Sequence, residues 1–427
     1  MHESVAAPRT VAIRPRLQRQ AGLLWTDYWY LFGISLVALV VVDPLEWGIA
    51  GNVLAKHVAL LVVLPAVVLA RLLRMAMPDT EPRATRVRPF AEPLAVAWPL
   101  AIFALIVICG SAYARFALDI RSTFLTYGLY VSMLFCAAAM VRQCEAPLAL
   151  VRGYFGILLA CALAMSVLLV VHAGERQVYH EQIFLVIPMA ALFFAGKGPA
   201  LIRWGAAAFF VSMAWFSHKY TSYLVGALAV AYLAAFVWLP RLPRGDPFGR
   251  AVAVYWGVLA LVTALAAAAA YALLGDSELP SGNTQFRLHT YQEAWDRFLE
   301  SPLWGTWFTR AAAEKFTLYE IGIAGNVLPT HSDVLDLLAN GGALALGLCA
   351  AGVLAIAALA WRRLLRPEFS ERPEAAYGHA LALLSLAAML TCAFNPILLQ
   401  PPMAALAWSN LGMLLGLSLR ANAPPGR

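Results

Sequence analysis

Arg287 is the residue whose charge and setting point most directly to chemistry. It lies in the polar segment 275–336 and, by its spacing, in the first turn of a predicted helix. Backbone N–H groups at a helix start attract anions, and a guanidinium binds phosphate oxygens through two parallel hydrogen bonds. Arg287 therefore predicts a phosphate or diphosphate site. The alternative is a solvated arginine, or one paired with Glu293 or Asp296.

His331 is the candidate general base. It stands in Pro329-Thr330-His331-Ser332-Asp333, where the polar segment meets the next apolar run. If Thr330 caps the helix that begins here, the helix dipole favours the neutral imidazole, which is the form that a base needs near neutral pH. Asp333 is the rival, as the base itself or as a helix cap. A capping or interfacial histidine without chemistry is the third alternative.

Capping and stop signals predict the helix that carries Arg287. Asn283 or Thr284 can cap it, and Ser301-Pro302 ends it near residue 300. One face of this helix is apolar, and it consists of Leu288, Tyr291, Trp295, Phe298 and Leu299. Such a stripe predicts that the helix lies on the membrane or against the rest of the protein.

The elements that position these residues must sit in lipid. Of the 427 residues 62% are hydrophobic and 13% are charged, which no soluble surface tolerates. A span needs about 20 apolar residues, and the chain predicts about twelve transmembrane helices in an all-α polytopic fold. The expected spans are 28–42, 57–73, 95–114, 122–141, 150–171, 182–195, 201–216, 223–239, 251–274, 341–361, 376–394 and 403–419. The sixth is short and holds Pro188, so we expect it to be broken or only partly spanning.

The distribution of basic residues predicts the orientation. Most Lys and Arg residues fall in the segments that are cytoplasmic if the N-terminus is inside. Both termini are then cytoplasmic, and the loop 275–336, between the ninth and tenth spans, is extracytoplasmic and holds short amphipathic helices. We expect residues 1–427 to form a single membrane domain. The net charge of +7 is a topology signal, so we expect no nucleic-acid partner.

The motifs of the loop resemble those of the O-antigen ligase and O-antigen polymerase superfamily, which are GT-C-type membrane glycosyltransferases. The resemblance rests on three pieces in order: Arg287 with Trp295, the turn from Pro302 to Gly305, and His331 followed by two glycines at 341 and 342. The motifs cover residues 287–342, and the helix pattern covers the whole chain.

The resemblance implies a reaction at the periplasmic face of the bacterial inner membrane. The donor would be a glycan on undecaprenyl diphosphate, and the acceptor would be a sugar of lipid A-core or, in a polymerase, a second lipid-linked glycan. His331 would act on the acceptor hydroxyl and Arg287 would bind the diphosphate. No metal or other cofactor is expected, because the diphosphate is already a good leaving group and the sequence holds neither a zinc-ligand cluster nor a P-loop.

The chain departs from the family pattern ahead of the eighth span. Many members carry a Ser-Arg-Gly-like turn there, whereas this sequence reads Ser217-His218-Lys219-Tyr220. Lys219 keeps the charge without the planar fork of an arginine, so it is a second diphosphate ligand or a lysine that reaches the membrane surface. Arg176, His180 and Glu181 lie in the loop before the sixth span. Only this location suggests that they help to bind the diphosphate.

A transporter of lipid or sugar is the alternative from another class, because many carriers also have twelve helices. Ion-coupled carriers need charged residues at the middle of their spans. The predicted spans hold almost none, and the polar residues gather in one extracytoplasmic loop instead. The sequence therefore favours the transferase.

Overall fold

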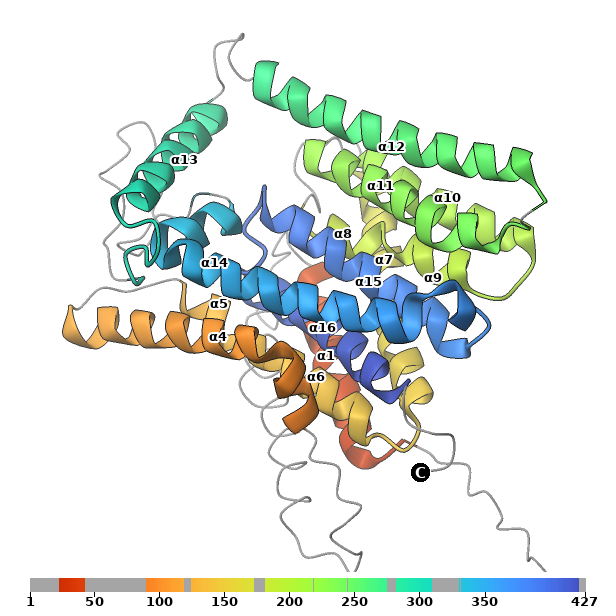
Figure 1. Cartoon of the computed structure of the whole chain (residues 1–427), viewed down its shortest axis with the longest axis horizontal. Coiled ribbons are helices and arrows are strands. Elements are labelled where there is room, and N and C mark those ends of the chain that lie inside the picture. The colour runs from red at the N-terminus through yellow and green to blue at the C-terminus, as the bar shows by residue number, and fades with distance from the viewer. Residues whose placement is uncertain are drawn as a thin grey trace, which may run out of the picture.

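The computed structural model describes residues 23–42, 90–118, 124–172, 181–217, 219–243, 245–274, 282–308, 330 and 332–421. Within these ranges every regular element is a helix, which confirms the predicted all-α fold. The longer helices lie side by side in one bundle (Figure 1).

The helices are named here in chain order, with the short π and 3₁₀ segments marked η. They are α1 (Trp25–Val42), α4 (Ala91–Ala117), α5 (Leu125–Leu129), α6 (Val131–Gln143), α7 (Pro147–Val171), α8 (Ile183–Val186), α9 (Met189–Ala195), α10 (Ala200–Phe216), α11 (Tyr220–Tyr232), η3 (Leu233–Trp238), η4 (Leu239–Arg241), α12 (Pro247–Leu274), α13 (Gly282–Glu300), α14 (Asp333–Ala360), η5 (Trp361–Leu365), η6 (Pro367–Phe369), α15 (Pro373–Cys392) and α16 (Pro401–Arg420).

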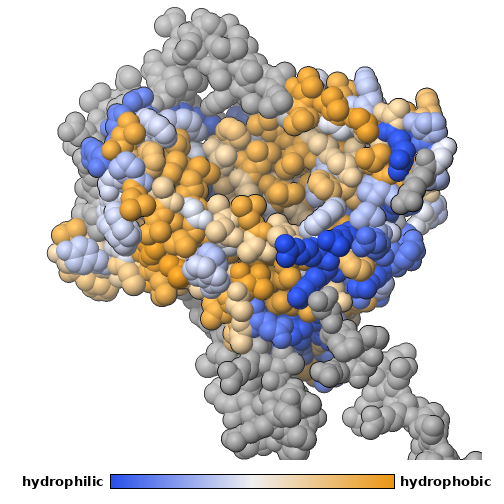
Figure 2. All heavy atoms as spheres, in the orientation of Figure 1, coloured by the Kyte–Doolittle hydropathy of each residue, from blue (hydrophilic) through white to orange (hydrophobic). Residues whose placement is uncertain are grey.

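Eight helices of the described chain are long and apolar enough to cross a membrane. Shorter apolar helices run over Ile183–Ala195, Ala200–Phe216 and Pro247–Val262. Each expected span thus has a helix at its position, except 57–73, which lies outside the described residues. Large apolar side chains cover the flanks of the bundle, as a surface in contact with lipid tails requires (Figure 2). The chain is a multi-pass membrane protein.

Local sequence explains the breaks in these helices. Ile187 and Pro188 separate α8 from α9, as the proline predicted, because a proline has no N–H to continue the helical ladder. The backbone of α4 is non-helical at Ala97, two residues before Pro99. The backbone of α14 is non-helical at Gly342, where φ is +63°.

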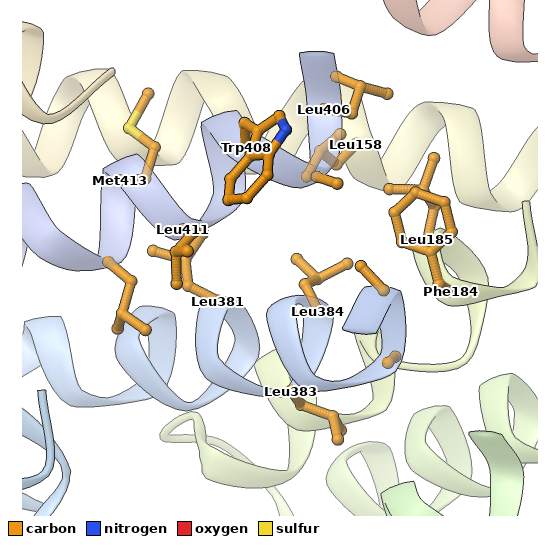
Figure 3. Close-up of a cluster of buried hydrophobic side chains, with 14 of the residues drawn as sticks. Leu158, Phe184, Leu185, Leu381, Leu383, Leu384, Leu406, Trp408, Leu411 and Met413 are labelled. Carbon is orange, nitrogen blue, oxygen red and sulfur yellow. The ribbon is translucent and has the colours of Figure 1, made fainter. Parts of the chain in front are cut away.

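The core of the bundle is built around α16. Trp408 of this helix is fully buried, in a cluster of apolar side chains that includes Leu158 of α7 and leucines of α15 and α16 (Figure 3). Gly412 allows α16 to approach α6 closely, since a Cβ atom there would lie 2.2 Å from the carbonyl oxygen of Leu134. Small residues at such crossings are how membrane helices pack. Tyr154 on α7 also donates a 2.7 Å hydrogen bond to Oδ1 of Asn410.

Candidate functional site

The helix that carries Arg287 forms as predicted, and it ends at Glu300, directly before Ser301-Pro302. It begins at Gly282, slightly earlier than expected, so Arg287 lies in its second turn and not its first. The predicted position in the first turn is therefore wrong by one turn.

The face of α13 that packs on the protein also differs from the predicted stripe. Among the α13 side chains that the structure describes, Thr290 and Ala294, one turn apart, are the buried ones, whereas Trp295 and Leu299 are about half exposed. α13 packs against α14 with its small-residue face because two helices can approach closely there. Trp295 and Leu299 are left on the outside, and Tyr291 and Phe298 are partly buried.

The hydroxyl of Thr290 links the two candidate motifs. Its Oγ1 lies 3.1 Å from the carbonyl oxygen of Arg287 and 3.5 Å from that of Thr330. Arg287 and the residue before His331 are therefore held at the same end of the bundle, where α13 meets the start of α14 (Figure 1). His331 itself lies outside the described residues.

Ser332, and not Thr330, caps α14. Its Oγ accepts the N–H of Leu335 at 3.3 Å. The hydroxyl of Thr330 is engaged with the backbone of Ser332, donating to its carbonyl at 2.9 Å and accepting its N–H at 3.1 Å. The predicted cap was wrong by two residues. Serine and threonine both cap helices, and the sequence has Thr330 and Ser332 at this point.

Asp333 is fully buried and held from two sides. Its Oδ1 accepts the hydroxyl of Tyr127 at 2.7 Å, and its Oδ2 accepts the N–H of Leu398 at 2.8 Å. Tyr127 also reaches Oδ2 of Asp336 at 3.2 Å, and Oδ1 of Asp336 accepts the N–H of Thr330 at 3.0 Å. The two carboxyl groups thus fix the first turn of α14 and the backbone that leads into it.

The segment between α15 and α16 connects the parts of this end of the bundle. Asn395 donates from Nδ2 to Oγ1 of Thr221 at 3.1 Å. The N–H of Leu398 in the same segment donates to Asp333. The side chain of Gln400 donates to Oε2 of Glu181. Sequence reasoning missed this segment and Tyr127. Polar residues beside prolines between two spans, at 395–396 and 400–402, were the available signal.

The positive charge of Arg287 acts on the carboxyl group of Glu181. Burial raises the pKa of Glu181, and the hydrogen bond from Gln400 and the positive charge of Arg287 oppose this shift without cancelling it. The alternative partners of Arg287 are engaged elsewhere: Glu293 lies 4.0 Å from Arg297, and Asp296 accepts from Gln292 at 2.9 Å. Nε of Arg287 is buried and has no hydrogen-bond partner among the described residues.

Lys219 lies at the same end of the bundle. It directly precedes α11, next to Thr221, which binds Asn395. The hydroxyls of Ser217 and Ser222 lie 2.6 Å apart and close the turn around it. Arg176 lies outside the described residues.

The turn from Pro302 to Gly305 docks on the two glycines of α14. Backbone hydrogen bonds run from Ala343 to the Pro302 carbonyl (2.8 Å) and from Leu344 to the Leu303 carbonyl (3.1 Å). A Cβ atom on Gly342 would lie 2.4 Å from the backbone of Leu303, and one on Gly305 would lie 2.5 Å from the backbone of Asn340. Only glycines allow this approach, so the two motifs are halves of one contact.

No three His, Cys, Asp or Glu side chains are grouped so as to hold a metal ion in the part of the chain that the structure describes. What this end of the bundle does present is a partly buried arginine, a lysine and a partly buried carboxyl group of raised pKa. Such a set can bind a phosphorylated group.

Comparison with known proteins gives one match to a family. A family model described as O-antigen ligase matches residues 205–350. No curated protein matches the chain. The matched range contains Lys219, Arg287, His331 and the glycine contact of α14. Together with the bundle of apolar helices, this match supports the resemblance of the chain to the O-antigen ligase superfamily.

Proposed function

We propose that this protein is an O-antigen ligase, which transfers a glycan from undecaprenyl diphosphate to a sugar hydroxyl of lipid A-core at the periplasmic face of the bacterial inner membrane. The observation that carries the proposal is the link through Thr290, which holds Arg287 and the residue before His331 at one end of the bundle. This reaction needs a positive side chain that stabilises the leaving diphosphate and a base that takes the proton of the acceptor hydroxyl.

In the proposed reaction the acceptor oxygen attacks the anomeric carbon of the donor sugar. The bond from that carbon to the diphosphate oxygen breaks, and the diphosphate leaves with the electron pair. His331 takes the proton of the acceptor hydroxyl. No metal is needed in this scheme, because positive side chains stabilise the leaving diphosphate.

Arg287 is proposed to bind the diphosphate. Its buried Nε makes no hydrogen bond within the described residues, so no described group competes with a ligand for this donor. Burial raises the pKa of Glu181, so its carboxyl group opposes an anionic ligand at Arg287 less strongly than an ordinary exposed carboxylate would as the pH falls. Lys219 and Arg176 are proposed as further diphosphate ligands.

Asp333 is better suited to positioning than to proton transfer. Both of its oxygens accept hydrogen bonds from the protein, and the side chain is fully buried. A base must reach the proton that it abstracts. We therefore assign the base to His331 and give Asp333 the role of holding the start of α14.

The experiment is transfer by the purified protein from an undecaprenyl-diphosphate glycan, with lipid A-core either present or absent. A ligase makes product only when lipid A-core is present. A ladder of repeats formed without it would instead show the second candidate, an O-antigen or exopolysaccharide polymerase. Uptake of a lipid or sugar into vesicles without any transfer would show a transporter and contradict both enzyme assignments.

Charge substitutions test the diphosphate site in the same assay. Arg287→Ala should abolish or greatly weaken transfer and donor binding, and Arg287→Lys should restore only part, because a lysine cannot form two parallel hydrogen bonds. Lys219→Ala should be milder. Equal activity of the wild type and Arg287→Ala would remove this residue from the site.

A further inference from the structure

A cavity of about 580 Å³ lies at the end of the bundle opposite to the candidate site. It is lined from α7, α9, α10, α15 and the turns that precede α10 and α15. α7, α10 and α15 begin at this cavity and run to the other end, where the segments 181–182, 217–222 and 395–400 lie. The cavity is therefore separate from the proposed transferase site by the length of these helices.

One side of the cavity is strongly basic. Arg152, Lys197, Arg203 and Arg372 line it, and no acidic side chain is among the described residues that do so. Hydrophilic side chains gather at this end of the molecule, near the end of α14 (Figure 2). Four positive charges around one hollow predict an anionic ligand.

The protein itself neutralises little of this charge. Lys197 lies 3.0 Å from Glu371, but both side chains are mostly exposed, and such pairs contribute little. Arg203 lies over the ring of Phe194, and its buried Nε has no hydrogen-bond partner in the described chain. Arg372 lies over the ring of Phe369. None of the three arginines has an acidic partner among the described residues.

The other side of the cavity is apolar. Phe155, Leu159 and Leu192 line it, and Ile202, which is 61% exposed, carries the apolar surface out to the flank of the bundle. A free phosphate or a sugar phosphate would leave this half unused. A membrane lipid has an anionic head for the arginines and an acyl chain for the apolar wall.

We infer that this cavity binds an anionic phospholipid, with the phosphate of its head group between Arg152, Arg203 and Arg372 and an acyl chain along Phe155, Leu159 and Leu192. Basic pockets between transmembrane helices bind anionic head groups in this way. The lipid packs between α7, α9 and α15 and joins helices that also build the other end of the bundle. The inference is independent of the transferase assignment.

Native mass spectrometry of the purified protein tests the inference, with phosphatidylglycerol, phosphatidylcholine of the same acyl chains and glycerol phosphate as separate probes. The wild type should retain phosphatidylglycerol and not the other two. The triple variant Arg152→Ala, Arg203→Ala, Arg372→Ala should bind phosphatidylglycerol at least about tenfold more weakly. Arg250→Ala, which removes an exposed arginine outside the cavity, should bind like the wild type.

A second variant tests the apolar half without touching charge. Gly156 lines the cavity, and a Cβ atom there would meet nothing within 4 Å, so Gly156→Leu should fold and block the acyl chain. Reduced binding of phosphatidylglycerol by this variant supports the inference. Equal binding of both lipids, tight binding of glycerol phosphate alone, or wild-type binding by Gly156→Leu would overturn it.

Discussion

The hydroxyl of Tyr127 lies 2.7 Å from Oδ1 of Asp333, which joins α5 to the first residue of α14 across 206 positions of the sequence. Oδ2 of the same carboxyl group accepts the N–H of Leu398, so three distant segments meet at one side chain. Asp333 is two residues beyond position 331, and the described residues on either side of that position, Thr330 and Ser332, are hydrogen-bonded to each other.

Tyr127→Phe should loosen this anchor. The change removes the one hydroxyl that reaches both Asp333 and Asp336, and leaving buried acceptors without a donor costs about 1 to 3 kcal/mol. We expect a lower melting temperature in detergent and a lower kcat at nearly unchanged donor affinity. Tyr113→Phe is the matched control, because Tyr113 is 59% exposed. Equal loss in both variants would show that the Tyr127 hydroxyl has no special part.

Gly342→Ala should destabilise the protein by about 1 to 3 kcal/mol, because the residue has a φ of +63° and a Cβ atom would lie 2.4 Å from the Leu303 backbone. The turn from Pro302 to Gly305 would be pushed off α14. Gly347→Ala on the same helix should be neutral or slightly stabilising, since its Cβ atom meets nothing within 4 Å. Thermal unfolding compares the two, and a stable Gly342→Ala would refute the close contact.

Glu181 predicts a pH dependence with a definite sign. Burial raises its pKa above the ordinary 4.5, so the folded protein holds this proton more tightly than the unfolded chain. The associated stability is present below about pH 4.5 and is lost as the pH rises through the raised pKa. Donor binding should weaken over the same range, because the carboxylate that forms beside Arg287 competes with the diphosphate.

Glu181→Gln should flatten both pH profiles, since the amide stays neutral at every pH. Glu145→Gln, which changes an exposed residue, is the control and should keep the wild-type profiles. Melting temperature and donor affinity, each measured from about pH 4.5 upward, provide the test. A Glu181→Gln protein with unchanged pH dependence would contradict this account of the Arg287 environment.

Sequence periodicity predicted the helices well, because a membrane span is a local property of about 20 apolar residues. Pro188 even marked the break between α8 and α9. The stop of α13 at Glu300 followed from Ser301-Pro302 in the same way. These features depend on neighbours in the chain, and the sequence displays them directly.

The contacts of the site could not be predicted in this way, because they join residues far apart in the chain. Asp333 could be seen as polar at a helix start, but nothing local showed that Tyr127 and Leu398 would bind it. The face of α13 that packs on α14 could not be identified from the sequence for a related reason. Small residues such as Thr290 and Ala294 pack best between membrane helices, whereas the hydrophobic stripe is not compelled to face the protein when lipid is outside.

The topology prediction places α13 and the start of α14 outside the cell membrane and the α11–α12 turn inside. A cysteine introduced at Ser281 should react with a membrane-impermeant thiol reagent in intact cells. Gly245→Cys, in the turn before α12, should react only after permeabilisation; a Cβ atom there meets nothing within 4 Å, so the change is tolerated. The reverse labelling pattern would put the proposed active site on the wrong face.

Turnover of the His331→Ala protein, with donor binding measured on the same preparation, tests the central proposal most directly. A positioned base contributes about 100-fold to 10,000-fold in rate, so transfer should fall by that factor while the undecaprenyl-diphosphate glycan still binds. Asp333→Asn, measured alongside, should lose stability together with activity, because both oxygens of this buried carboxyl group accept hydrogen bonds that hold the start of α14. If His331→Ala keeps wild-type turnover while a folded Asp333→Asn protein is inactive, the base is Asp333. If both variants turn over like the wild type, the transferase mechanism proposed for this site is wrong.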